Sequence, residues 1–351
     1  MPKYVAMIKT TQIAADRAFD EAKTVLPVEV ARGVYIENPP GAEALKLMHL
    51  LIGKAGGRMA DDVRHELRLA DIKKIDGMRN HTRATLRKLF IELSGAVIVF
   101  DDTEAQCEII GGFLDRAKLD YRHEVSDDLL VAWWFGGAFR EMAEKSCHWA
   151  IIDRQTVFAL SSKYSILLFQ HVASLVNLNH ITRKTFTVAE LRAVMGVEDG
   201  KMERFSNLNQ RVIQPAIAEI NQTSRLTLTA TPRKIGRTVA SVTIAWEEKP
   251  QEVKKEAKRE LDRPKVGRKA RREGTTDVLV PPFPASGGLS RSIALDARWR
   301  ELFETHVTRI QGGKLPDSKL VCDAFRKVRG DKLDDTTTER HFINFCKQWR
   351  G

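Results

Sequence analysis

Apolar residues between positions 203 and 237 follow a helical period first and an alternating period afterwards. One helix face is marked by Phe205, Leu208, Val212, Ile213, Ala216, Ile217 and Ile220. Leu226, Leu228 and Ala230 then alternate with polar residues, as does the run RTVASVTIAW that follows the turn sequence PRKIG. The pattern predicts one helix followed by a hairpin of two strands.

Two further helices are expected before this one. Ser161 or Ser162 can cap a helix that runs to about Asn177. Thr187 and Glu190 form a capping box, which opens a short helix ahead of Gly196. Three helices followed by a basic hairpin is the element order of a winged helix, so we assign a winged-helix domain to residues 149–248.

The same order of elements occurs once before, without obvious sequence identity. Helices are expected at 41–55, 64–75 and 80–93, and strands at 95–102, 107–114 and 127–135. We assign a first winged helix to residues 41–148. Residues 1–40 contain one predicted helix, 13–26, and are otherwise interpreted as an N-terminal arm.

A strongly basic, apolar-poor stretch follows the second copy. Residues 249–273 hold eleven Lys/Arg against five Asp/Glu, and PPFPASGG follows at 281–288. This composition predicts a flexible basic linker over 249–288. Helical periods in ALDARWRELFETHV and TERHFINFCKQW predict a small helical domain over 289–351. The expected fold class is α+β: two tandem winged-helix domains, a basic linker and a small helical C-terminal domain.

The charge balance narrows the choice of partner. A formal net charge of +11 and a pI near 9.5 favour a polyanion, and nucleic acid fits better than a membrane because no basic amphipathic terminus is present. The N-terminus lacks an apolar signal core, and the longest uncharged apolar run, LLVAWWFGGAF, is shorter than the roughly 20 residues of a membrane span. We expect a cytoplasmic protein without a membrane partner.

Polar residues on the predicted third helix of the second copy point to DNA. Asn207, Gln210, Arg211 and Gln214 are spaced to share the face opposite the apolar one. Amides and arginine are the side chains that make bidentate contacts with base edges in the major groove. The alternative is a solvated surface, although such surfaces usually carry Glu/Lys pairs. Pro215 is expected to bend this helix.

Two groups of basic residues are candidates for contacts with the DNA backbone. The hairpin turn contributes Arg233, Lys234 and Arg237, which can reach phosphates or the minor groove; the alternative is an exposed turn that only aids solubility. On the third helix of the first copy, Arg79, Arg83 and Arg87 follow one another at steps of four residues and would lie in one stripe. For this stripe, phosphate contact and plain solvation are equally good interpretations.

Three segments between about 150 and 248 carry a family resemblance: SSKYSILLFQHVASL, FTVAELRAVMGV and FSNLNQRVIQPAIAEINQTSRLTLTATPRKIGRTVASVTIAW. They resemble the second winged helix of the Rep initiator proteins of iteron-containing, theta-replicating bacterial plasmids. The run from Arg211 to Asn221 is the most specific part. Over 41–137 the similarity is one of element order only, and the segment after 249 has no recognised counterpart.

The resemblance implies a function. In that family two winged helices contact successive major grooves of direct repeats, monomers start replication, and dimers formed through the first winged helix repress the initiator's own gene. Such initiators help to open AT-rich DNA and recruit the host DnaA and the replicative helicase. The DNA-binding positions that carry over are Ser206, Asn207, Gln210, Arg211, Gln214, Arg233, Lys234 and Arg237.

Enzyme classes are disfavoured by the motifs. IGKAGGR and GGKLP lack the P-loop spacing, no two histidines stand two apart as in a rolling-circle nickase, and no carboxylate cluster typical of a nuclease is found. The four cysteines form no CxxC pair, so neither a metal nor a cofactor is expected. A winged-helix transcriptional regulator without an origin function is the main alternative; a nickase or nuclease is a weaker one.

Overall fold

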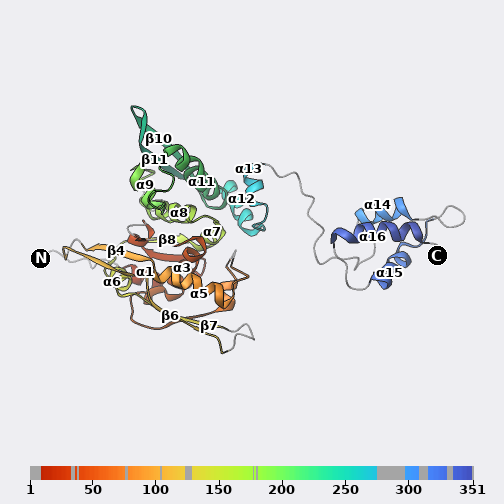
Figure 1. Cartoon of the computed structure of the whole chain (residues 1–351), viewed down its shortest axis with the longest axis horizontal. Helices are drawn as coiled ribbons and strands as arrows, with labels where there is room; N and C mark the ends of the chain where they lie inside the picture. Colours follow the sequence, from red (N-terminus) through yellow and green to blue (C-terminus); the bar gives the residue numbers. More distant parts are fainter. Residues whose placement is uncertain are drawn as a thin grey trace. The chain divides into compact units, whose positions relative to one another are not determined.

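The computed structural model describes residues 9–32, 36–37, 39–75, 78–102, 105–122, 129–176, 178, 181–274, 297–307, 315–329 and 335–349. The chain divides into two compact units, residues 1–274 and 275–351, which are described separately (Figure 1). Among the described helices, none combines the length and the apolar character that crossing a membrane requires.

The N-terminal segment belongs to the first unit instead of forming an arm. It contains α1 (Thr10–Asp16), β1 (Lys23–Pro27), α2 (Val28–Ala31) and β2 (Ile36–Glu37). The predicted helix 13–26 is wrong beyond Asp16, because β1 pairs antiparallel with β8 (Trp149–Asp153), with Lys23 opposite Asp153. A pairing partner this distant in sequence overrides the local helical period.

The first winged helix contains more strands than its pattern predicts. Its elements are α3 (Ala42–Ala55), η1 (Gly56–Arg58), β3 (His65–Arg68), α4 (Leu69–Lys73), α5 (Arg83–Ser94), β4 (Val97–Asp102), β5 (Cys107–Gly112), β6 (Leu114–Asp120), β7 (Leu130–Phe135) and α6 (Gly137–Lys145). The strands form two sheets, with orders β2-β4-β5 and β3-β7-β6. The predicted helix 64–75 begins as a strand, because His65 and Leu67 alternate inward while Glu66 and Arg68 face solvent.

A short connection leads from the first winged helix to the second. After β8, Asp153 caps α7 (Arg154–Ala159): its carboxylate accepts the backbone N–H groups of Gln155, at 3.1 Å, and Thr156, at 3.4 Å. Because β8 pairs with β1 and α7 follows it directly, the connection is fixed to the N-terminal segment.

The second winged helix has the predicted element order. It contains α8 (Lys163–Val176), β9 (Arg183–Thr187), α9 (Val188–Val194), α10 (Phe205–Leu208), η3 (Asn209–Ile213), α11 (Gln214–Thr223), β10 (Leu226–Ile235) and β11 (Thr238–Glu248). One sheet of order β10-β11-β9 completes it, and the tip of the β10–β11 hairpin projects beyond the body of the domain (Figure 1). The predicted capping box is present: Thr187 Oγ1 accepts from the Glu190 N–H at 3.1 Å, and Glu190 accepts from the Thr187 N–H at 2.7 Å.

The predicted flexible linker is wrong over its first half. Residues 251–262 form α12 (Gln251–Asp262) and residues 268–273 form α13 (Arg268–Glu273). The buried Arg268 guanidinium donates to the Ala159 carbonyl at 2.9 Å and to the Glu260 carbonyl at 3.2 Å, while Arg271 pairs with Glu260 at 2.7 Å. Arg268, Arg271 and Glu260 therefore anchor this segment to the fold, while other charges such as Lys258 and Lys269 remain exposed. The expected Pro/Gly/Ser-rich part, 281–288, lies outside the described residues.

The second unit contains three described helices: α14 (Ala297–His306), α15 (Ser318–Arg329) and α16 (Asp335–Gln348). Their shared core includes Leu302, Phe303, Phe325, Phe342 and Cys346. Phe325 and Phe342 meet edge to face, with ring centroids 5.2 Å apart. The small helical domain expected over 289–351 thus corresponds to these helices.

Candidate nucleic-acid interface

The helix from α10 through α11, here called the recognition helix, separates two faces. Its apolar side packs into the core through Leu208, Val212, Ile213, Ala216, Ile217 and Ile220, each at most 6% exposed. On the opposite side Ser206, Gln210, Arg211 and Gln214 are exposed, and Asn207 is half-buried. The predicted polar face therefore exists as a surface.

The helix departs from regular α-helical hydrogen bonding next to Pro215, and the expected bend stays a prediction. Pro215 cannot donate a backbone hydrogen bond to the Arg211 carbonyl, which would be its partner four residues back in an α-helix. The five residues Asn209–Ile213 take the wider π-helical turn, and the α-helix resumes at Gln214. A π segment of this kind re-spaces side chains on a helix surface and recurs at functional sites. Here it contains Gln210 and Arg211.

The polar groups on this face are largely available to a ligand. The Gln214 side-chain amide donates to Asn209 Oδ1 at 3.3 Å. Within the described part of the chain, the Arg211 and Gln210 side chains form no hydrogen bond or ion pair. An unpaired, exposed guanidinium keeps its fork of donors free for two acceptors at once.

Two polar residues that were not predicted as functional hold this helix in place. Glu219 is 4% exposed, and its Oε1 accepts from the Ser161 backbone N–H at 2.7 Å and from the Ser161 hydroxyl at 2.5 Å. Asn221 exchanges two hydrogen bonds with the backbone of Leu228, at 2.7 and 2.9 Å. The sequence does indicate them, because each is a polar residue next to the apolar positions of the helix. They fix the recognition helix to the segment between α7 and α8 and to β10.

The hairpin, here called the wing, differs in detail from the prediction. Arg233 and Lys234 lie on β10, not in the turn, and the register shifts between them. The turn itself is formed by Gly236, whose φ of +62° is costly for other residues, and Arg237. All three cations are exposed, and none forms an ion pair with another described residue. Fully solvated cations on a protruding hairpin suit phosphate contact.

The three arginines of the first winged helix do not form the single stripe that was predicted. Thr82 caps α5, its backbone N–H donating to Thr85 Oγ1 at 2.8 Å, so that Arg79 precedes the helix in a turn. Arg83 lies on α5 with its guanidinium 4.5 Å from the Tyr121 ring centroid, and Arg87 is exposed one turn later. The structure brings Arg83 and Arg87 together and leaves Arg79 off the helix.

Two buried histidines lie where the N-terminal part of the unit meets α8. His49 of α3 hydrogen-bonds through Nε2 to Gln170 Oε1 at 3.1 Å, and Gln170 donates to the Val30 carbonyl at 3.1 Å. His171 meets the Arg32 carbonyl through Nδ1 at 2.8 Å. Burial lowers the pKa of both histidines to about 4, so each imidazole is neutral at pH 7. Neutral imidazoles here complete packing between the two winged helices.

Comparison with known proteins agrees with this geometry. Residues 187–246 match the family model described as "Initiator Rep protein, WH2", a span that contains the recognition helix and the wing. No curated protein sequence matches the chain. Among the described residues, no group of three His, Cys, Asp or Glu side chains could hold a metal ion.

Several solved structures are similar to the chain, and two of them are compared with it here. One is the Pi initiator protein, crystallised in complex with iteron DNA, with a TM-score of 0.51 and 15% identity over 66% of this chain and 99% of that chain. The other contains domains 2 and 3 of RctB, with a TM-score of 0.36 and 10% identity over 58% of this chain and 80% of that chain; a similarity this low supports no argument. The first match shows that the chain shares its mixed α and β fold with that protein. Residues 187–246 are thus similar to the second winged helix of the initiator Rep protein family.

Proposed function

We propose that this protein is a plasmid replication initiator that binds direct repeats, or iterons, at its origin. The observation that carries the proposal is the exposed polar face of the recognition helix beside the basic wing, inside the segment that matches the initiator family. Ser206, Asn207, Gln210, Arg211 and Gln214 are assigned to base edges in the major groove.

The remaining cations are assigned to the DNA backbone. Arg233, Lys234 and Arg237 extend from the wing and take phosphates beside the groove that the recognition helix enters. In the first winged helix Arg87, together with Arg83 and Arg79, contacts phosphates of a neighbouring groove. Such contacts set register and affinity and carry no sequence information, so specificity resides in the second winged helix.

Self-association is assigned to the first winged helix. The β5 strand lies at one end of the sheet order β2-β4-β5, and Ile110 on it is 65% exposed. An edge strand with an exposed apolar side chain is a surface on which a second copy can pair. A monomer in equilibrium with this homodimer would start replication as the monomer and repress its own gene as the dimer.

Further steps follow from the same role in the bacterial cytoplasm. The bound initiator helps to open adjacent AT-rich DNA and recruits the host DnaA and the replicative helicase. No catalytic step is assigned to the chain itself, which acts without a cofactor. A nickase or nuclease activity is disfavoured because the sequence lacks the paired histidines and the carboxylate cluster that these enzymes use. A transcriptional regulator without an origin function remains the alternative, since it would use the same recognition helix.

DNase I footprinting on the DNA that flanks the protein's own gene tests the proposal. Protection of several direct repeats of about 20 base pairs, roughly two helical turns for two grooves, beside an AT-rich stretch is the expected result. Protection confined to one inverted repeat would favour the regulator. A Gln210→Ala, Arg211→Ala double variant, which leaves the core untouched, serves as the matched control and should lose protection of the repeats.

A further inference from the structure

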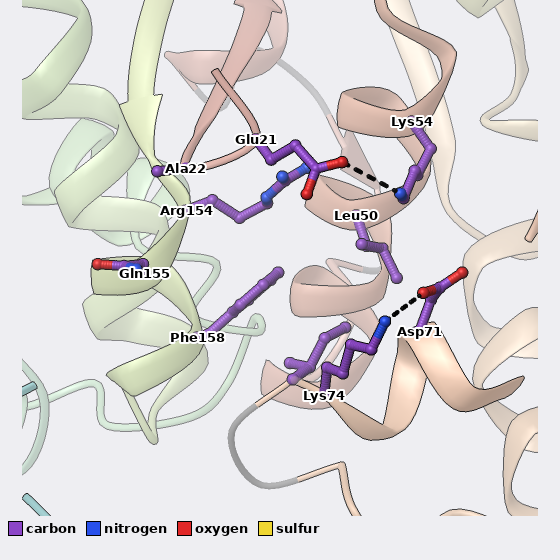
Figure 2. Close-up of a pocket in the computed structure, with 10 residues that line it drawn as sticks. Glu21, Ala22, Leu50, Lys54, Asp71, Lys74, Arg154, Gln155 and Phe158 are labelled. Carbon is purple, nitrogen blue, oxygen red and sulfur yellow. Dashed lines mark hydrogen bonds and ion pairs between the residues drawn. The ribbon is translucent and has the colours of Figure 1, made fainter. Parts of the chain in front are cut away.

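A half-open pocket of about 350 Å³ lies in the first unit, well away from the recognition helix along the chain. Its walls come from the segment before β1, from α3, from the end of α4 and from α7 (Figure 2). It is therefore bounded by the first winged helix on one side and by the helix that leads to the second on the other. The proposed DNA contacts make no use of it.

Arg154 is the unusual residue of this pocket. It is only 7% exposed, yet among the described residues its guanidinium has no hydrogen-bond or ion-pair partner. Burial lowers the pKa of Arg154, while Glu21 and Asp20 act in the opposite direction. A buried arginine without a hydrogen-bonded protein partner is uncommon, because removal of a charge from water is costly; Glu21 and Asp20 offset part of that cost here.

Space for this guanidinium is made by Gly53 in α3. A Cβ atom at Gly53 would lie 2.2 Å from Arg154 Nη1 and 3.2 Å from Thr24 Oγ1. Glycine weakens a helix interior, so its presence within the 14-residue α3 needs a packing reason. The slot holds the head of Arg154 against α3 while the guanidinium still lines the pocket.

The other charges around Arg154 are weakly held. Lys54 lies 3.8 Å from Glu21, whose side chain is 83% exposed, so water screens this pair. Lys74 pairs with Asp71 at 2.9 Å near the mouth of the pocket. Figure 2 shows the Glu21 side chain between those of Arg154 and Lys54, with Leu50 near the middle of the view and Phe158 below Arg154.

We propose that this pocket binds a phosphate group, free or carried by a small molecule. Arg154 would present two parallel N–H donors to the phosphate oxygens, and Lys54 would turn from Glu21 to supply the second positive charge. Arg154 and Lys54 contribute two positive charges, and the exposed Glu21 carboxylate beside them leaves a net charge of +1, which suits a phosphate monoanion. Leu50, Ile75 and Phe158 give the pocket an apolar wall that can hold the body of a phosphate ester. Because Arg154 begins α7, bound phosphate would brace the connection between the two winged helices.

Thermal unfolding of the full chain in increasing inorganic phosphate, at constant ionic strength set with potassium chloride, tests the site. The wild-type melting temperature should rise saturably by a few degrees, as expected when a ligand binds only the folded state. Arg154→Met should be at least as stable as the wild type without phosphate, because it removes a buried unpaired charge, and should lose the saturable rise. A parallel series with adenosine monophosphate distinguishes free phosphate from an ester that uses the apolar wall.

Lys88→Met, which removes an exposed charge on α5, is the matched control and should keep the full response. Equal responses of the wild type and Arg154→Met would overturn the proposal, since phosphate also stabilises proteins by exclusion from their surface. A second variant, Lys54→Gln, is expected to fold normally. It should weaken phosphate binding several-fold, so that a higher phosphate concentration is needed for half of the rise in melting temperature. An unchanged half-saturating phosphate concentration in Lys54→Gln would equally contradict the site.

Discussion

The two winged helices have the same order of three helices but present different third helices. In the first, α5 is a regular α-helix whose exposed positions include Arg87, Lys88 and the 62% exposed Ile91. In the second, the recognition helix contains a π segment and exposes amides and one unpaired arginine. Point charges suit phosphates, whereas amides and a free guanidinium suit base edges. The exposed side chains of the third helix can thus suit two domains of the same fold to different contacts with DNA.

A second difference lies around the third helix. The second winged helix has a projecting wing and is extended by α12 and α13, which pack against it and against α7. The strands of the first winged helix form two sheets, and β5 is left at an edge. We infer that the second domain is held rigid for sequence recognition, while the first offers an edge for association.

The largest expected effect is on the contact between the two domains at acid pH. Folded His49 and His171 have pKa values of about 4, against an unfolded value of about 6.5, so the unfolded state binds protons first as pH falls. Their contribution is fully present above pH 6.5 and is lost between 6.5 and 4, at about 3 kcal/mol per histidine. Urea unfolding at pH 7, 6, 5 and 4.5 measures this loss.

The groups that face these two histidines are Gln170 and Arg154 for His49, and Arg32, Lys184 and the Phe186 ring for His171. None of them is a carboxylate that would offset the proton uptake. In a His49→Gln variant, whose residue 49 cannot be protonated, the free energy of unfolding should depend clearly less on pH. If its stability falls with pH as steeply as that of the wild type, other groups control the acid response.

The extension of the second winged helix gives the next effect. Arg268→Ala removes the hydrogen bonds to Ala159 and Glu260 and leaves part of the Glu260 charge unpaired in the interior, so we expect about 2 to 3 kcal/mol of destabilisation. Lys269→Ala, on the same short helix but 78% exposed at its side chain, is the matched control and should change stability little. Equal stability of the two variants would mean that α12 and α13 are only a spacer, as their composition first indicated.

A smaller effect, on binding alone, is expected at the recognition helix. Arg211→Ala should weaken binding to the repeat by about 1 to 3 kcal/mol and relax the preference at one base pair, the usual size of a bidentate base contact. Unfolding should be unchanged because the side chain is exposed and unpaired. Val212→Ala, at the adjacent buried position, is expected instead to lower thermal stability first. Fluorescence anisotropy with single-base variants of the repeat measures the change in preference.

The smallest effect is expected at the wing. Arg233→Ala should weaken binding to every sequence alike and lower the slope of log K against log salt by about 0.9, the release expected for one phosphate contact. Lys234→Ala should behave in the same way, and Thr231→Ala on the same exposed hairpin is the uncharged control. A base-dependent loss in Arg233→Ala would place the wing among the groups that read sequence.

Local pattern predicted those parts of the fold whose partners are close in sequence. The Thr187 capping box, the amphipathic recognition helix and the β10–β11 hairpin depend on residues within a few positions of one another, and all three are present. The polar face of the recognition helix was predictable for the same reason. Its role in DNA binding stays a prediction.

Features with distant partners were not predictable in this way. Strand β1 pairs with β8, more than a hundred residues later, and neither sequence alone reveals the other. Helices α12 and α13 looked like a solvated linker because their stability comes from buried charge pairs and from contacts with Ala159 and Gln222. The π segment and the Glu219–Ser161 hydrogen bonds likewise need three-dimensional placement.

The most direct test of the central claim compares one arginine from each third helix. Binding of wild type, Arg211→Ala and Arg87→Ala to the direct repeat and to a scrambled repeat would be titrated side by side at several salt concentrations. Arg211→Ala should lower the ratio of the two affinities, while Arg87→Ala should lower both affinities equally and leave the ratio unchanged. A folded Arg211→Ala protein with the wild-type ratio would contradict the assignment of sequence recognition to the second winged helix.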